Sequence, residues 1–318
     1  MRNRVIIVMY HYVRDLSHSR YPGIKGLDLD LFRQQLDFFK SEGYRFISPD
    51  LLLEAVNGGN VPEKSVLLTF DDGYLDHYTN VFPILVKENI TSVFSMPGKI
   101  LAEHKVLNVN KIHFLLASVE TKELFSAICK MLDYYRGSEF SYPSTAELYA
   151  KLAHPNRFDS AEVIFIKRLL QVELPELLRN LIVDDLFRKF VSTNEESFAR
   201  ELYMSMDQVC LMKREGMTFA YHGYDHSWID RLDKDSLNTD IERALETFSD
   251  IIDRRRWICC YPYGSCSDSV IETVKAKGAL CGIGSDANVA DLTVIDPFRI
   301  PRLDTNDFPP KSNNYLKF

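Results

Sequence analysis

The sequence predicts an α/β barrel that carries an inserted α-helical subdomain. Three observations support this fold class: short apolar runs recur along the chain, helical patterns lie between most of them, and one long interval contains helical patterns alone. The apolar runs have the length and composition of strands that are buried on both faces. There are seven of them, namely Val5–Tyr10, Arg45–Ser48, Val66–Phe70, Thr91–Met96, Met217–Tyr221, Ile258–Tyr263 and Leu280–Ser285.

The helical patterns between these runs place apolar residues at steps of three and four positions. They cover Leu31–Glu42, Tyr78–Glu88, Asp207–Arg214, Ser236–Asp253 and Ser267–Lys277. Ser267 is suited to cap the start of the last helix, and Gly278 to close its end. Strands and helices in alternation predict a parallel sheet with crossover helices. Seven strands without a glycine-rich dinucleotide fingerprint favour a barrel over an open Rossmann sheet.

The long interval without a strand run lies between Leu101 and Met206. Helical stripes fill it, as in the spacing of Leu174, Leu178 and Leu181. We therefore predict an α-helical insertion over residues 104–204. The barrel domain would then consist of residues 1–103 and 205–318.

The composition restricts the classes of protein to which the chain can belong. Its 318 residues are 46% hydrophobic and 26% charged, which is typical of a folded globular protein. A net charge of -7, without a basic run interleaved with aromatic residues, argues against nucleic acid as a partner. The N-terminal run Val5–Tyr10 is far shorter than the ~20 residues of a membrane helix, and no signal-peptide cleavage site follows it. We expect no integral membrane segment and a cytoplasmic location.

Two adjacent carboxylates follow the strand run that ends at Phe70. In Thr69-Phe70-Asp71-Asp72-Gly73 they stand at the carboxyl end of a predicted strand, where barrel enzymes place their reactive groups. Adjacent carboxylates raise each other's pKa unless a cation compensates, so a bound metal ion is one interpretation. A helix N-cap is the other, and this pentapeptide alone does not decide between them.

Two histidines follow another strand run, Met217–Tyr221. His222 and His226 are four positions apart, so both imidazoles can reach one ion from the same side. With one aspartate they form a mixed oxygen and nitrogen set that suits zinc, with cobalt or another first-row divalent ion as alternatives. Such a set leaves positions open for water and substrate.

Two further strand ends add candidate groups. The turn Tyr261-Pro262-Tyr263-Gly264 has backbone N–H groups that could face a developing oxyanion, although such turns are structural more often than catalytic. His11 follows the first strand and would lie on the same rim of a parallel barrel. It could act as a general acid, or it could simply bond to the backbone.

These motifs resemble those of the polysaccharide deacetylases, also called the NodB-homology or carbohydrate esterase 4 family. Thr69–Gly73 reads TFDDG, the first motif of the family, without a change. His222 and His226 match the second motif, H-S/T-x-x-H, with Gly223 at the hydroxyl position, and Pro262–Gly264 matches the third. The resemblance covers residues 1 to about 100 and about 205 to the end. It implies a distorted (β/α)7 barrel.

The resemblance also implies a role for each of these residues. Asp71 corresponds to the general base, and the backbone amide of Tyr263 to the oxyanion donor. Asp72, His222 and His226 correspond to the ligands of a divalent metal ion.

The sequence departs from the family pattern at two places. Cys260 occupies the position of the arginine that usually braces the catalytic aspartate, and Arg299 or Arg302 could substitute for it. No Leu-x-His-Asp motif follows Gly264, although the family normally draws its general acid from one. His11 is then the candidate acid, because it resembles the histidine that follows a tyrosine on the first strand of circularly permuted members.

The resemblance therefore implies a metal-dependent hydrolase that removes an N-acyl group, an acetyl group, from an amino sugar of a glycan or glycan precursor. Asp71 would take a proton from the attacking water, and His11 would protonate the departing amine. The expected location favours a nucleotide- or lipid-linked substrate in surface polysaccharide synthesis. Two alternatives remain: a non-catalytic glycan-binding protein on the same fold, and a metal-dependent amidase for a compound that is not a sugar.

Overall fold

The computed structural model describes residues 3–137, 140–156 and 159–318. The chain divides into two compact units. The first consists of Met1–Asp15, Gly26–His104 and Arg200–Phe318, and the second of Leu16–Lys25 and Lys105–Ala199. The second unit therefore includes Leu16–Lys25, a segment that lies within the predicted barrel domain, residues 1–103.

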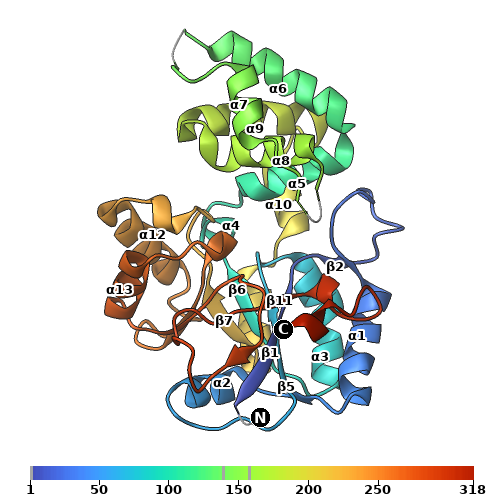
Figure 1. The fold of residues 1–318 in the computed structure, drawn as a ribbon, viewed down its shortest axis with the longest axis vertical. Helices are drawn as coiled ribbons and strands as arrows, with labels where there is room; N and C mark the ends of the chain where they lie inside the picture. Colours follow the sequence, from blue (N-terminus) through green and yellow to red (C-terminus); the bar gives the residue numbers. More distant parts are fainter. Residues whose placement is uncertain (1–2, 138–139, 157–158) are drawn as a thin grey trace. The chain divides into compact units, whose positions relative to one another are not determined.

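The first unit is built on a curled sheet, whose central strands are visible in Figure 1. Its main strands are β1 (Arg4–Tyr10), β4 (Arg45–Phe46), β5 (Ser65–Phe70), β6 (Val93–Met96), β7 (Thr218–Tyr221), β8 (Trp257–Cys260) and β9 (Ala279–Ile283). They follow the order β1-β5-β6-β7-β8-β9, with β4 paired to β5, and all of these pairings are parallel. The seven predicted strand runs and the predicted barrel class are confirmed.

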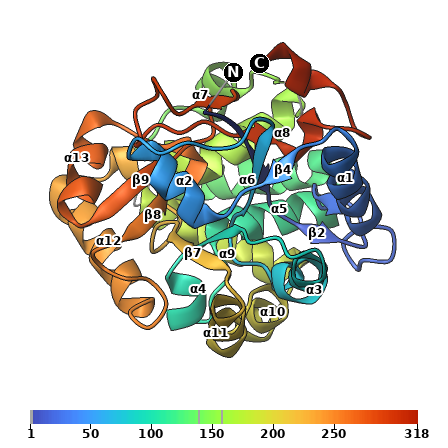
Figure 2. The ribbon, with the colours of Figure 1, turned by 90° about the horizontal axis from the view of Figure 1, so that it is seen from below.

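Helices surround this sheet, as the view of Figure 2 shows for α1, α3, α11, α12 and α13. The helices of the first unit are α1 (Leu29–Ser41), α2 (Pro49–Val56), α3 (Phe82–Lys87), α4 (Lys99–Ala102), α11 (Met206–Arg214), α12 (Lys234–Thr247) and α13 (Asp268–Ala276). A π-helical turn, His77–Val81, precedes α3. The predicted cap of α13 is confirmed, because the Ser267 hydroxyl accepts the backbone N–H of Val270 at 3.3 Å.

Two local expectations were wrong. Helix α12 ends at Thr247 rather than continuing to Asp253, because the chain leaves the helical conformation at Phe248. Phe248, Ile251 and Ile252 are buried, but they lie in turns. Their apolar spacing is therefore like that of a helix although no helix is present. Strand β4 ends at Phe46, and Ser48 is the N-cap of α2, accepting the N–H of Leu51 at 3.1 Å.

The segment Ile300–Asp304 spans the gap between the two ends of the sheet. Ile300 forms a parallel bridge with Ile283 of β9, and β11 (Leu303–Asp304) pairs in parallel with β1. This segment carries Arg302, whose side chain is almost completely buried. Three further short strands are β2 (Val13–Arg14) and β3 (Leu27–Asp28), which pair with each other, and β10 (Ala290–Asp291), which is antiparallel to β1.

Apolar side chains fill the barrel, and polar ones gather at one rim. Every residue of β5 is buried, and the core cluster includes Val5, Ile7, Leu67, Val93, Ala220, Ile258, Ile283 and Ile300. Because the main strands run parallel, their carboxyl ends lie at the same rim. The residues that follow β1, β5 and β7 are His11, Asp71 and His222, so the rim is where the site begins.

The second unit is helical. It contains α5 (Asn108–Ser118), α6 (Thr121–Tyr135), α7 (Thr145–Leu152), α8 (Ala161–Arg168), a π-helical turn (Leu169–Glu173) and α9 (Glu176–Phe190), while α10 (Glu195–Leu202) crosses into the first unit. The buried ammonium group of Lys111 lies 2.6 Å from Asp184 and 2.8 Å from Glu195, and so links α5 to α9 and α10. Within the part of the chain that the structure describes, no helix combines the length and apolar composition needed to cross a bilayer.

Candidate active site

Asp72, His222 and His226 come together at the rim of the barrel. The Oδ1 atom of Asp72 lies 3.6 Å from Nε2 of His222 and 3.3 Å from Nε2 of His226. One ligand atom from each of the three residues lies within 4.8 Å of the others, and all three side chains are buried. The two sequence motifs, 150 positions apart, thus converge on one point.

The donor atoms of this cluster fit a divalent metal ion. The Oδ1 atom of Asp72 is buried and has no hydrogen-bond partner among the described residues, which is costly for a carboxylate unless a cation faces it. Burial lowers the pKa of His222 to about 4, so its ring is neutral at physiological pH. Its Nδ1–H donates to the carbonyl oxygen of Cys260 at 2.8 Å, which leaves the Nε2 lone pair on the side of Asp72. Two imidazoles and a carboxylate are ligands that zinc commonly takes.

The backbone of the site is held in an uncommon conformation. Asp72, His226 and Tyr263 all have positive φ, at 75°, 54° and 58°. Non-glycine residues in this left-handed region cost roughly 1–3 kcal/mol each and concentrate at functional sites. The surrounding contacts must therefore impose these conformations.

Main-chain hydrogen bonds fix the loop that carries the two histidines. The N–H groups of Gly98 and Lys99 donate to the carbonyl oxygens of Gly223 and Tyr224, at 3.1 and 2.9 Å. The buried carboxylate of Asp240, on α12, accepts the N–H of Tyr224 at 2.8 Å. Two segments, one before the loop in the sequence and one after it, thus hold it in place.

Asp71 forms a bidentate ion pair with Arg302. The Nη1 atom of Arg302 lies 2.9 Å from Oδ1 of Asp71, and Nη2 lies 2.8 Å from Oδ2. The Ser95 hydroxyl also donates to Oδ1, at 2.5 Å. Burial alone would raise the pKa of Asp71, but the guanidinium charge, with the nearby His222 and His11, holds that pKa below its usual range. Asp71 is therefore ionised.

The structure shows which of the two candidate arginines, Arg299 or Arg302, braces Asp71. Arg302 contacts Asp71, whereas Arg299 pairs at the surface with Asp268 at 2.6 Å. The guanidinium group of Arg302 is further fixed by bonds to the carbonyl oxygen of Gly284 and the hydroxyl of Thr69, at 2.7 and 3.1 Å. Arg302 thus approaches the carboxylate from the segment that spans β9 and β1.

His11 lies directly after β1, close enough for its charge to act on the carboxyl groups of both Asp71 and Asp72. Its backbone is fixed by His77, because Nε2–H of His77 donates to the carbonyl oxygen of His11 at 2.8 Å. Burial lowers the pKa of His77 to about 4, so this ring is neutral. The sequence did not indicate His77, which lies in the π-helical turn.

Tyr263 stands over the histidine loop. Its ring meets that of His226 edge-on, with centroids 4.5 Å apart, and stacks on Trp228 at 4.6 Å. Gly264 follows with φ 69°, and a Cβ there would lie 2.1 Å from the Ser285 hydroxyl, so only glycine fits this position. The turn therefore has a fixed shape beside the cluster.

Several residues of this site were missed by sequence reasoning. Ser95 and Tyr74 bond to the two aspartates, and Asp240 and His77 hold the loops that carry the histidines. Each is a common residue type without a motif around it. The only available signal was Tyr74, which directly follows the TFDDG pentapeptide.

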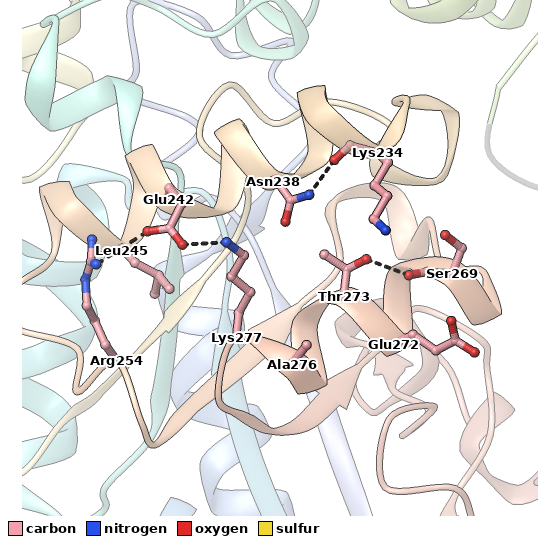
Figure 3. A pocket seen from close by; sticks show the side chains of 10 residues that line it. All are labelled: Lys234, Asn238, Glu242, Leu245, Arg254, Ser269, Glu272, Thr273, Ala276 and Lys277. Carbon is pink, nitrogen blue, oxygen red and sulfur yellow. Dashed lines mark hydrogen bonds and ion pairs between the residues drawn. The ribbon is translucent and has the colours of Figure 1, made fainter.

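A cavity of about 580 Å³ lies between α12 and α13, away from the residues described above (Figure 3). Its charged side chains largely neutralise one another, because Glu242 pairs with both Lys277 and Arg254, at 2.5 and 3.4 Å. Asn238 and Thr273 bond to main-chain carbonyl oxygens of their own helices. Several of the polar side chains that line the cavity are thus already bonded within the protein.

Comparison with known proteins agrees with this geometry. The family model described as polysaccharide deacetylase matches residues 58–127 and 189–281, just over half of the chain. The poly-beta-1,6-N-acetyl-D-glucosamine N-deacetylase of Escherichia coli (strain K12) is 39% identical over 85 residues, which are 26% of this chain and 12% of that protein. The chain thus matches only a small part of that relative's length.

Two solved structures have a similar fold over nearly their whole length. The deacetylase PplD of Streptococcus pyogenes, in complex with acetate, has a TM-score of 0.57 and 17% identity, with coverage of 100% of this chain and 98% of that one. A de-N-acetylase from Aggregatibacter actinomycetemcomitans has a TM-score of 0.58 and 18% identity, with coverage of 98% and 100%. At these identities the likeness concerns the fold alone.

Proposed function

The chain belongs to the polysaccharide deacetylase family, and on that premise we propose that it is a metal-dependent N-deacetylase acting on the amino sugars of a polysaccharide. The observation that carries the proposal is the pair of neighbouring aspartates in different surroundings. Asp72 directs a buried, unbonded oxygen at two imidazoles, whereas Asp71 is ionised and held by Arg302. Asp72 is therefore suited to bind a metal ion, and Asp71 to act as a base.

Asp72, His222 and His226 would hold the ion. When bound, a divalent ion at such a site polarises the acyl carbonyl group and lowers the pKa of a bound water. Zinc is the first candidate from the donor set, with cobalt as an alternative.

Asp71 serves as the base that accepts a proton from the attacking water. Its Oδ1 atom accepts hydrogen bonds from Ser95 and Arg302, whereas among the described residues Oδ2 has only the contact with Nη2 of Arg302. The Oδ2 atom therefore has the free lone pair for the incoming proton. The fixed guanidinium group keeps the carboxylate oriented during the transfer.

Two further groups complete the reaction. The backbone N–H of Tyr263 donates to the oxyanion that forms when water adds to the acyl carbon. The imidazole of His11 gives a proton to the sugar nitrogen as the C–N bond breaks, so that acetate and a free amine leave. The hydrogen bond from His77 to the His11 carbonyl oxygen supports this role because it fixes the backbone of the acid.

We propose a β-1,6-linked N-acetylglucosamine polymer as the substrate class. The support is the segment shared with the Escherichia coli enzyme, whose name specifies that polymer. A nucleotide- or lipid-linked N-acetylated sugar is the other form of substrate, and the experiment below includes one.

The test is metal analysis of the purified chain together with acetate release from defined substrates. We expect about one divalent ion per chain and acetate release from β-1,6-linked N-acetylglucosamine oligomers, abolished by a chelator and restored by zinc or cobalt. Release from UDP-N-acetylglucosamine alone would reassign the substrate to a precursor. Stoichiometric binding of oligomers by the metal-loaded chain without any release would contradict an enzymatic function.

A further inference from the structure

The two oxygens of the Asp72 carboxylate have different surroundings. The Oδ1 atom faces the imidazoles and has no hydrogen-bond donor within the described structure. The Oδ2 atom accepts the phenolic hydroxyl of Tyr74, two positions further along the chain, at 2.5 Å. A single donor thus makes one oxygen of the carboxylate different from the other.

The backbone between these residues produces this contact. Asp72 and Gly73 both adopt positive φ, at 75° and 68°. Two consecutive residues in the left-handed region reverse the chain direction sharply, so the Tyr74 side chain returns toward the carboxylate that precedes it. The TFDDG motif therefore does more than supply the aspartates, because its glycine sets the path of the next residue.

The Tyr74 ring is held firmly in place. It is completely buried and stacks on Tyr12, with ring centroids 3.9 Å apart and planes inclined by 20°. On another side its ring is nearly parallel to that of Tyr203, and the two ring centroids are 6.2 Å apart. The main chain of Tyr74 forms an antiparallel bridge with Tyr203, and the N–H of Met204 donates to the Gly73 carbonyl oxygen at 3.0 Å. The hydroxyl therefore cannot move away from Oδ2 without displacing packed rings and paired backbone.

We propose that Tyr74 is a positioning residue that reserves Oδ2 of Asp72 for its own hydroxyl and so presents Oδ1 alone to the metal ion. This inference rests on the proposed metal site. A carboxylate that is free at both oxygens can bind an ion through both of them, whereas one whose second oxygen holds a short hydrogen bond binds through one. Binding through one oxygen keeps an additional coordination position for water or substrate.

A purely structural role for Tyr74 makes a different prediction. If the hydroxyl only satisfied a buried carboxylate, its removal would lower the stability of the chain but leave the way in which the ion is bound unchanged. The measurement must therefore report on coordination rather than on activity alone.

The test compares Tyr74→Phe with Tyr10→Phe by titrating the metal-free chains with Co²⁺. Tyr10 is a matched control because it is also completely buried, and its hydroxyl has no hydrogen-bond partner among the described residues. We expect Tyr74→Phe to weaken Co²⁺ binding roughly 10- to 100-fold and to change the intensity and position of the d–d absorption bands. Tyr10→Phe should keep both the affinity and the spectrum of the wild type.

An unchanged spectrum and affinity in a folded Tyr74→Phe chain would overturn the proposal. A second measurement does not depend on the folding of that variant. The infrared difference spectrum of the wild type on adding Zn²⁺ should show the wide separation of carboxylate stretching bands that accompanies binding through one oxygen. A narrow separation, characteristic of binding through both oxygens, would also overturn it.

The outcomes distinguish this inference from the proposed function. If the wild-type chain binds no divalent ion, the proposed function fails first. If the wild type binds the ion and releases acetate while Tyr74→Phe has the same Co²⁺ spectrum, only the role of Tyr74 fails.

Discussion

The guanidinium group of Arg302 and the carboxylate of Asp71, 231 positions apart in the chain, form two parallel contacts of 2.9 and 2.8 Å in a buried environment. Both side chains are almost fully shielded from solvent, so each charge would be buried without compensation if the other were removed. Parallel contacts of this kind fix the orientation of the carboxylate as well as its charge.

Replacing Arg302 by Met should therefore affect both stability and turnover. Removing one partner of a buried pair costs about 3–5 kcal/mol, and a base that is no longer oriented should lose on the order of 100-fold in kcat. Urea denaturation and acetate release measure the two effects. Arg299→Met is the matched control, because its pair with Asp268 is exposed and its loss should change stability by less than about 0.5 kcal/mol. Wild-type turnover in Arg302→Met would show that the pair does not support catalysis.

Asp71→Asn should separate the base from the metal site. An amide cannot accept the proton, so kcat should fall by about 100- to 10,000-fold. Metal content, measured by mass spectrometry of the metal ions, should remain near that of the wild type, because Asp71 is outside the cluster of ligand atoms. Asp72→Asn, as the contrasting variant, should lose the ion. Substantial turnover in Asp71→Asn would exclude this residue as the base.

His11→Gln should reveal a general acid through its dependence on the leaving group. A sugar amine must be protonated as it leaves, whereas the 4-nitrophenolate of an activated acetate ester leaves without a proton. We expect a loss of about 100- to 10,000-fold on the N-acetylated sugar and a much smaller loss on the ester. The exposed His18, replaced in the same way, serves as the control. Equal losses on the two substrates would point to a role for His11 other than proton donation.

His77 should contribute to the pH dependence of stability. Burial lowers its pKa to about 4 in the folded chain, against roughly 6.5 in the unfolded chain. Between these values the unfolded state binds the extra proton, so stability is full above the unfolded pKa and falls as the pH decreases toward 4. The slope from one such group approaches about 1.4 kcal/mol per pH unit.

Replacing His77 by Gln in the metal-free chain should remove that part of the slope. Urea denaturation at several pH values between 4 and 7 measures the slope, and part of it should remain because burial also lowers the pKa of His222 to about 4. The exposed His154 provides a control on the second unit. A slope in His77→Gln equal to that of the wild type would mean that His77 is charged in the folded chain.

The strands and the residues that follow them were predictable because their signals are local. A run such as Val66–Phe70 carries its apolar pattern within a few positions, and the pairs Asp71–Asp72 and His222–His226 stand next to such runs. Parallel strands then bring these ends to one rim. The start of α2 also had a local signal, the sequence Ser48-Pro49, but Ser48 was assigned to the end of a strand instead.

The supporting contacts were not predictable in the same way. The bond from Ser95 to Asp71 and the bond from His77 to His11 join residues that only the fold brings together. A single serine or histidine has no spacing that indicates its partner. For Arg302 the sequence supplied two candidates, and only the pairing of Ile300 with β9 determines which one turns toward the barrel.

The strand pairing of Ile300–Asp304 has a consequence for the order in which the chain acquires its site during synthesis. The ribosome adds Arg302 after every other residue of the active site, so a nascent chain that ends before it already contains both aspartates and both histidines. In such a chain Asp71 would have to be buried without its counter-charge, which opposes closure of the barrel. The five residues Ile300–Asp304 therefore both join β9 to β1 and supply the counter-charge of the base.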